Sequence, residues 1–215
     1  MVDAANNIDS SAGSTLHINA TVVIRENHAF RNGKVIFSTE QNSCAEFLGA
    51  LHQFTGARYQ RFYKMDALSK LGWLAAEFLL DDKFKAQAYD PSKQGIILSN
   101  ANSSLDTDIR YQASMASIPS PAIFVYTLPN IVIGEIAIRH QMKGENAFYI
   151  FEQFNPQFIE QYVSVLLNNN ILQACVCGWV DVLAEHYEAA LFLVEKNGRE
   201  GSQPFTAGIM NQIYQ

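Results

Sequence analysis

The stretch FYIFEQFNP, Phe148 to Pro156, places an apolar run directly before the start of a predicted helix. The run stops at Glu152-Gln153, and Asn155 followed by Pro156 is a typical helix start, since Asn caps helices and proline fits their first turn. Strand-to-helix turns of this kind often present a nucleophile. Here the tip offers the amide of Gln153, which cannot act as one. The stretch therefore predicts either a catalytic type of turn without its reactive atom or an ordinary connection.

The segments on both sides of this turn alternate between strand and helix patterns. Strands are expected at residues 18–24, 34–38, 95–99, 147–151, 172–182 and 189–194, which are apolar or rich in β-branched side chains. Helices are expected at 44–54, 62–80, 104–116, 129–140 and 156–168, and the two prolines of 118–126 indicate a loop or an edge segment. This alternation predicts an α/β sandwich with a largely parallel sheet.

The length of 215 residues, 48% of them hydrophobic, fits one globular domain. Residues 1–16 are polar and are expected to be loose. Residues 17–200 are expected to form the single domain. Residues 201–215 are polar and are expected to form a C-terminal tail.

The charge pattern argues against a nucleic-acid partner. The formal net charge is -6, and no block of Lys and Arg stands out. A small basic group is formed by Arg58, Arg61, Lys64 and Lys70. It is either a solvated helix face or a docking patch for an acidic partner.

Three cysteines, Cys44, Cys175 and Cys177, are too few for a disulfide framework. Cys175 and Cys177 lie in an apolar run without further metal ligands nearby, so we expect small buried residues and no metal. No glycine fingerprint for a nucleotide appears, and no cofactor is expected. Because neither a signal peptide nor an apolar run of membrane-spanning length is visible, we expect a soluble protein in the reducing cytoplasm.

The order of segments from Asn130 to Asp181 resembles the core of the N-terminal half of β-ketoacyl synthases, which have the thiolase-like fold. The other matching segments are the helix Tyr63 to Leu80, the strand and loop GIILSNANSSLDTD (Gly95 to Asp108), the turn Lys143-Gly144 and the strand ALFLVE (Ala190 to Glu195). The resemblance covers about residues 60–195, in pattern more than in identity. It implies a thiolase-like half-fold, layered α-β-α, with a mixed, mostly parallel sheet of about five strands.

Two departures from the ketosynthase pattern change what the resemblance implies. Gln153 takes the position of the catalytic cysteine, whose thiolate is favoured by the N-terminus of the following helix. Chain-length-factor subunits of some polyketide systems carry a glutamine there, as do decarboxylating ketosynthase-like domains. The second half of the family, which supplies two histidines and a lysine, has no counterpart here. The histidines of this sequence are His17, His28, His52, His140 and His186, and only His186 follows Gln153.

The resemblance also implies two contacts with a partner. In the family, the strand before the catalytic turn pairs with its copy across a two-fold axis. That strand carries Phe148, Tyr149, Ile150 and Phe151 here, apolar or aromatic on both sides, and we expect it to form a dimer because a free apolar edge aggregates. Ile123, Phe124 and Tyr126 match the segment that walls the partner's acyl channel. The alternative is that these three side chains pack in their own core.

Three functions remain open from the sequence. The first is a non-catalytic, chain-length-factor-like partner of a full-length ketosynthase in bacterial fatty acid or polyketide biosynthesis, of the polyene type made by aryl polyene and flexirubin clusters. The second is a homodimeric half-fold that binds an acyl chain or an acyl-carrier protein without chemistry. The third is an enzyme with a relocated active site, built from Glu152, Asp106, Asp108 and His140.

Overall fold

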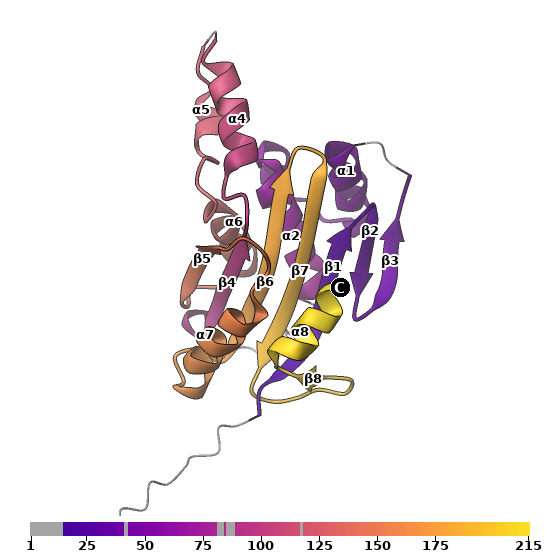
Figure 1. The fold of residues 1–215 in the computed structure, drawn as a ribbon, viewed down its shortest axis with the longest axis vertical. Coiled ribbons are helices and arrows are strands. Elements are labelled where there is room, and N and C mark those ends of the chain that lie inside the picture. The colour runs from indigo at the N-terminus through magenta and orange to yellow at the C-terminus, as the bar shows by residue number, and fades with distance from the viewer. Residues whose placement is uncertain (1–14, 41–42, 81–83, 85–88, 117) are drawn as a thin grey trace, which may run out of the picture.

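The computed structural model describes residues 15–40, 43–80, 84, 89–116 and 118–215. One eight-stranded sheet, in the order β3-β2-β1-β7-β6-β4-β5 with β8 beside β1, runs through the molecule (Figure 1). Its strands are β1 (His17–Arg25), β2 (His28–Arg31), β3 (Lys34–Ser38), β4 (Gln94–Asn100), β5 (Asn146–Ile150), β6 (Ala174–Leu183), β7 (His186–Glu195) and β8 (Gln203–Pro204).

Helices cover both faces of this sheet. The α-helices are α1 (Cys44–Thr55), α2 (Ala67–Leu79), α4 (Leu105–Ser114), α5 (Pro121–Phe124), α6 (Ile131–His140), α7 (Pro156–Asn168) and α8 (Ala207–Tyr214). Two short 3-10 helices lie at Gln60–Lys64 and Pro91–Lys93.

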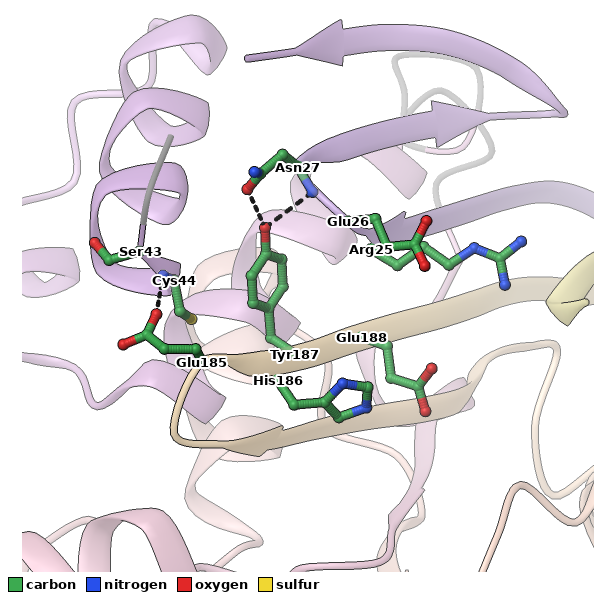
Figure 2. A pocket seen from close by; sticks show the side chains of 9 residues that line it. All are labelled: Arg25, Glu26, Asn27, Ser43, Cys44, Glu185, His186, Tyr187 and Glu188. Atoms are coloured by element: carbon green, nitrogen blue, oxygen red, sulfur yellow. Dashed lines mark hydrogen bonds between the residues drawn. The ribbon is translucent and has the colours of Figure 1, made fainter. Parts of the chain in front are cut away.

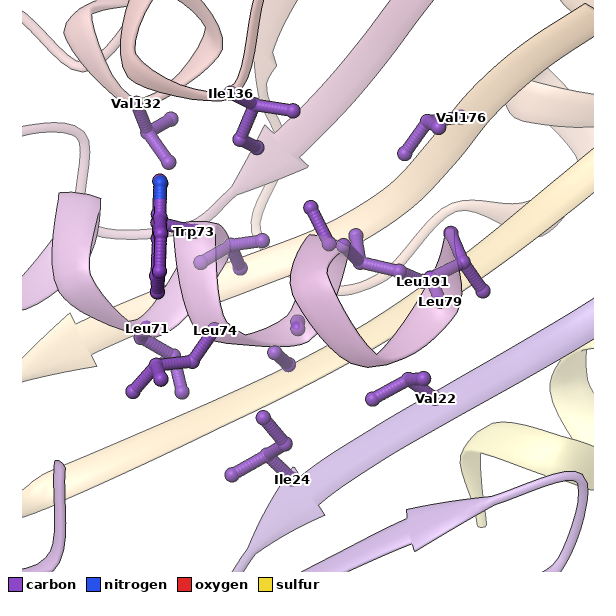
Figure 3. Close-up of a cluster of buried hydrophobic side chains, with 14 of the residues drawn as sticks. Val22, Ile24, Leu71, Trp73, Leu74, Leu79, Val132, Ile136, Val176 and Leu191 are labelled. Carbon is purple, nitrogen blue, oxygen red and sulfur yellow. The ribbon is translucent and has the colours of Figure 1, made fainter. Parts of the chain in front are cut away.

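The strands separate two hydrophobic cores because successive side chains point to opposite faces. In β6, Val176 belongs to the core that includes α1, α2 and α6, whereas Cys177 belongs to the core that includes α7 and α8. Figure 3 shows α2 on the sheet with α6 beside it, and Trp73 of α2 next to Val132 of α6. The predicted α-β-α layering is confirmed. It arises because apolar side chains recur every second residue in a strand and about every 3.6 residues in a helix, so each element has a face to bury.

The sheet is larger and less parallel than expected. β4 pairs in parallel with β5 and with β6, and the other pairings are antiparallel. Tight hairpins account for part of the difference. Glu26 and Asn27, both with positive φ, connect β1 to β2, a strand that the sequence pattern did not predict. Ala184, with φ 55°, helps to turn β6 back into β7.

Three other segments differ from the sequence expectations. The helix predicted from residue 62 begins at Ala67, because Asp66 caps it by accepting a hydrogen bond from the amide of Ser69. The segment 118–126, expected as a loop, contains the single-turn helix α5. The expected C-terminal tail, residues 201–215, carries β8 and α8, and its Phe205 and Met210 are buried. In the part of the chain described here, no helix is long and apolar enough to cross a membrane.

Candidate functional site

The strand-to-helix turn at residues 151–156, called the elbow below, has the geometry that its sequence predicts. At its start, the amide of Phe151 donates to the carbonyl of Asn100 over 3.0 Å. At its end, the side chain of Asn155 accepts a hydrogen bond from the amide of Phe158, and Pro156 is the first residue of α7. Phe154 is buried between these anchors, with its ring 6.1 Å from that of Phe192.

The tip of the elbow is open to solvent. Glu152 and Gln153 are exposed, and a hollow of about 360 Å³ lies against residues 151–155 and 157. The tip therefore stands just before the N-terminus of α7, where the unpaired amides of a helix favour negative charge. A thiol would be activated there, but the amide of Gln153 has no proton to lose and cannot form a covalent intermediate.

The loop that follows β4 lies beside the elbow, because the carbonyl of Asn100 at the end of β4 accepts the hydrogen bond from Phe151. A buried carboxylate fixes this loop. Asp181 on β6 accepts hydrogen bonds from the amides of Ala101 and Asn102 and from the Asn102 side chain, at 3.1, 3.0 and 2.6 Å. Sequence reasoning did not single out Asp181. An acidic residue inside the otherwise apolar run 172–182 was the feature that could have revealed it, since buried charges need partners.

The strand before the elbow, β5, lies at the edge of the sheet, and among the described residues it pairs only with β4. Phe148 packs toward the core of α2 and α6. Tyr149 and Phe151 face α7, where their rings lie 4.6 and 5.0 Å from that of Phe158. Ile150 is 49% exposed. The four predicted residues thus lie on β5 or directly after it, at a partly apolar edge that no further strand of the described residues pairs.

The three residues predicted to wall a partner's channel have different surroundings. They lie in or next to α5, which with α4 forms an arm that projects beyond the sheet (Figure 1). Tyr126 is buried in its own chain's core, and its hydroxyl lies 3.3 Å from Glu135 Oε1, as the alternative of own-core packing expected. Phe124 is 58% exposed, and its ring packs on Tyr111. Ile123 is half-buried.

The arm also gathers exposed apolar side chains from the chain between β4 and α6. They are Leu105, Ile109, Met115, Ile118, Phe124, Val125 and Leu128. An exposed apolar surface of this density is typical of a contact with another molecule.

The basic group predicted from the sequence surrounds the segment before α2. Arg58 and Lys64 are exposed. Arg61 is used within the chain, since it donates to the buried carboxylate of Glu135 over 2.9 Å. Lys70 is half-buried, and burial together with the nearby Arg110 lowers its pKa. Two of the four cations therefore remain for an acidic partner.

The four residues proposed for a relocated active site have different surroundings. Asp106 accepts from the amide of Ala184, and Asp108 accepts from Ser104. His140, at the end of α6, contacts Glu77. Glu152 is exposed at the elbow. Across the described residues, no group of three or more His, Cys, Asp or Glu could hold a metal, and all three cysteines are buried.

A second hollow, which the sequence did not predict, lies between the turns that end β1 and β6. It measures about 320 Å³ and is lined by residues 25–27, 43–44 and 185–188. Figure 2 shows the hydrogen bonds between the Tyr187 hydroxyl and Asn27, and the hydrogen bond that the amide of Cys44 donates to the Glu185 carboxylate. Burial, with Glu185 nearby, raises the pKa of the Cys44 thiol to about 12. His186 lines this hollow, which shares no residue with the hollow at the elbow.

The fold is that of the ketosynthases and chain-length factors, within the thiolase-like class. The ishigamide ketosynthase/chain length factor aligns with a TM-score of 0.62 and 16% identity, over 84% of this chain and 62% of its own. The structure of the type II PKS acyl-carrier protein AntF with its ketosynthase AntDE aligns with a TM-score of 0.59 and 12% identity. The alignment covers 85% of this chain and 62% of the other.

A third solved structure is the ketosynthase ApeO in complex with its chain length factor ApeC from Xenorhabdus doucetiae. It aligns with a TM-score of 0.53 and 11% identity, over 86% of this chain and 80% of its own. This chain thus spans about 62% of the length of the first two of these structures. No family model and no curated protein matches the sequence.

Proposed function

We propose that this chain is a non-catalytic, chain-length-factor-like partner of a full-length ketosynthase in fatty acid or polyketide biosynthesis of the polyene type. The observation that carries the proposal is the exposed Gln153 at the tip of an elbow whose anchors, the Phe151 amide and the Asn155 cap, are intact. The geometry that would activate a nucleophile is kept, and the nucleophile is replaced by an amide.

The rest of the site supports a role without chemistry in this chain. His186, the histidine that follows the elbow in the sequence, lines the separate hollow beside Cys44. Asp181, the buried carboxylate that holds the loop after Asn100, accepts three hydrogen bonds from that loop. Among the described residues that line the hollow at the elbow, the exposed Glu152 is the only acid or base.

A protein partner is supported by two apolar surfaces. The outer edge of β5 has backbone groups that no strand of the described chain pairs, and the exposed side chain of Ile150 lies on it. The arm of α4 and α5 adds Phe124, Val125 and Leu128. Free strand edges pair readily with another chain, so we assign β5 to the main contact and Ile123 and Phe124 to the contact at the partner's acyl channel.

Co-purification tests the proposal. The tagged chain is co-expressed with an untagged full-length ketosynthase from the same genome, and the eluate is analysed by gel filtration with light scattering. A one-to-one complex is expected, and its product length is expected to differ from that of the ketosynthase alone. A chain that stays monomeric at high concentration, both alone and with the ketosynthase, would overturn the proposal.

The homodimeric half-fold remains the second candidate, because β5 can also pair with β5 of another copy. The same experiment separates the two. A dimer of this chain alone, unchanged by the ketosynthase, favours the homodimer. An acyl-carrier protein is the third component that we assign to both, and the exposed Arg58 and Lys64 are the cations that an acidic carrier would contact.

A further inference from the structure

The C-terminal segment 203–215, called the strap below, crosses the α7 face of the sheet from β8 to the end of β1 (Figure 1). It buries Phe205 and Met210 in the same core as Phe154 and α7. Sequence reasoning treated these residues as a polar tail. In the structure, each end of the strap has its own set of hydrogen bonds, which together with these buried side chains hold it on the domain.

The first end of the strap is tied to α7. The amide of Ala207, at the start of α8, donates to Glu160 Oε2 over 2.7 Å, and Thr206 caps the helix through the amide of Ile209. A carboxylate suits this place because the N-terminus of a helix carries partial positive charge. The tie joins α8 to the helix that begins at the elbow.

The second end is held by Arg25 at the end of β1. Its Nη1 and Nη2 donate to the main-chain oxygens of Tyr214 and Gln215, each over 2.7 Å. A guanidinium can hold two oxygens at once, and its positive charge suits the C-terminal end of α8. Arg25 is therefore the latch of the strap.

Tyr214 connects the latched end to the elbow. Its ring lies 5.0 Å from the ring of Phe154, the residue after Gln153. Its hydroxyl donates to Glu188 Oε1 over 2.7 Å, and the same oxygen accepts from Trp179 Nε1 over 2.8 Å. Trp179 in turn meets Phe154, with the ring centres 6.2 Å apart. Phe154 thus contacts one ring of the strap, Tyr214, and the ring of Trp179, which shares its acceptor Glu188 with Tyr214.

We infer that the strap is a conformational device that fixes the elbow, with Arg25 as its latch and Tyr214 as the residue that presses on Phe154. Closing the strap holds Phe154 buried and Gln153 at the exposed tip. Releasing it frees the elbow and uncovers the apolar face of α7. The strap acts within one chain and does not depend on the proposed partner.

Hydrogen exchange of the full chain, followed by mass spectrometry, tests this inference. In Arg25→Gln, exchange is expected to rise about tenfold in residues 207–214 and also at the amides of Phe151 and Phe158, whose hydrogen bonds anchor the elbow. The reason is that a charge-assisted pair of hydrogen bonds is lost. Exchange in β4 is expected to stay unchanged. The matched control is Arg110→Gln. Arg110 is an exposed arginine on α4, and its ion pair among the described residues is with Asp106 of the same helix.

Hydrogen exchange at the amides of Phe151 and Phe158 decides whether the strap holds the elbow. Faster exchange in α8 with an unchanged elbow would show that the strap does not hold the elbow. Unchanged exchange in α8 would show that Arg25 is not its latch. If β4 loses protection as well, Arg25→Lys replaces the glutamine variant, since it keeps the charge and loses the two-oxygen grip, and the same two readings decide.

A second variant separates the latch from the pressing residue. Tyr214→Leu keeps an apolar side chain on α8 and the main-chain oxygen that Arg25 binds. It removes the ring beside Phe154 and the hydroxyl on Glu188. Exchange is expected to rise at the elbow while residues 207–211 keep their protection. An elbow that stays protected in this variant contradicts the role given to Tyr214.

Discussion

The carboxylate of Asp66 accepts a hydrogen bond from the hydroxyl of Thr107 over 2.7 Å and so ties α2 to the arm. Its other oxygen caps α2 at the amide of Ser69. Burial raises the pKa of Asp66, and these two hydrogen bonds oppose the rise. One side chain thus begins the helix that packs on the sheet and also positions α4, which carries part of the exposed apolar surface.

Thr107→Val is expected to destabilise the fold by about 1–3 kcal/mol, because it leaves an oxygen of the partly buried Asp66 carboxylate without its donor. Urea unfolding followed by circular dichroism measures the loss. Thr127→Val is the matched control, since that hydroxyl donates to the carbonyl of Phe124 at an exposed site. Equal losses in both variants would contradict the special role of the Asp66 contact.

Gly178→Ala is expected to cost roughly 3 kcal/mol or more, or to prevent folding. Gly178 has φ 143°, and a Cβ there would lie 2.0 Å from the carbonyl oxygen of Ala190 in the paired strand. Gly134→Ala in α6 is the control. A Cβ at Gly134 meets nothing within 4 Å, so this variant is expected to be neutral or stabilising. Thermal unfolding of the two variants checks the contrast.

Ile150→Lys is expected to weaken self-association, or association with a ketosynthase, by about tenfold or more, because a charge would be buried at the β5 edge. Val35→Lys is the matched control: Val35 is similarly exposed but lies on β3, at the other end of the strand order. Light scattering over a range of concentrations measures both. If only Val35→Lys lost association, the interface would lie at β3 and the assignment to β5 would be wrong.

Glu77 is expected to make stability fall in acid. Burial raises the pKa of Glu77, but the contacts with His140 and Arg139 outweigh burial and lower it to about 2. A carboxylate with a lowered pKa stabilises the fold above its unfolded value of 4.5, and this contribution is lost as pH falls from there toward 2. Glu77→Gln is expected to cost roughly 2–3 kcal/mol at pH 7 and much less near pH 2.

Denaturant unfolding at several pH values measures this difference. Glu145→Gln, at an exposed glutamate, is the control and is expected to show no such pH dependence. A cost of Glu77→Gln that stays constant from pH 7 to pH 2 would show that the carboxylate charge is not what stabilises this site.

Gln153→Cys is expected to gain a reactive thiol and no condensing activity. The new thiol would lie at an exposed helix start, where its pKa is lowered, whereas the three native cysteines are buried. Rapid alkylation of a single thiol, measured by mass spectrometry, checks the geometry of the elbow. Condensed product from the purified variant alone would overturn the proposal that the chain needs a partner for chemistry.

The sequence by itself determined the elements whose signals are local. Asn155 and Pro156 mark the start of α7 because a cap and a first-turn proline depend on neighbouring residues alone. The apolar run from Gly95 and the helical stripe from Phe158 likewise depend on a short window. The position of Gln153 at the elbow followed from these signals together with the resemblance to ketosynthases.

Only the tertiary structure decided which strands pair and which surfaces remain free. The sequence did not show that β7 lies between β1 and β6, and it left open whether Tyr126 turns inward while Phe124 stays exposed. Nor did it show that the polar-looking residues 203–215 fold onto Phe154. These facts depend on contacts between residues far apart in the chain, such as Arg25 with Tyr214, and no local pattern records such contacts.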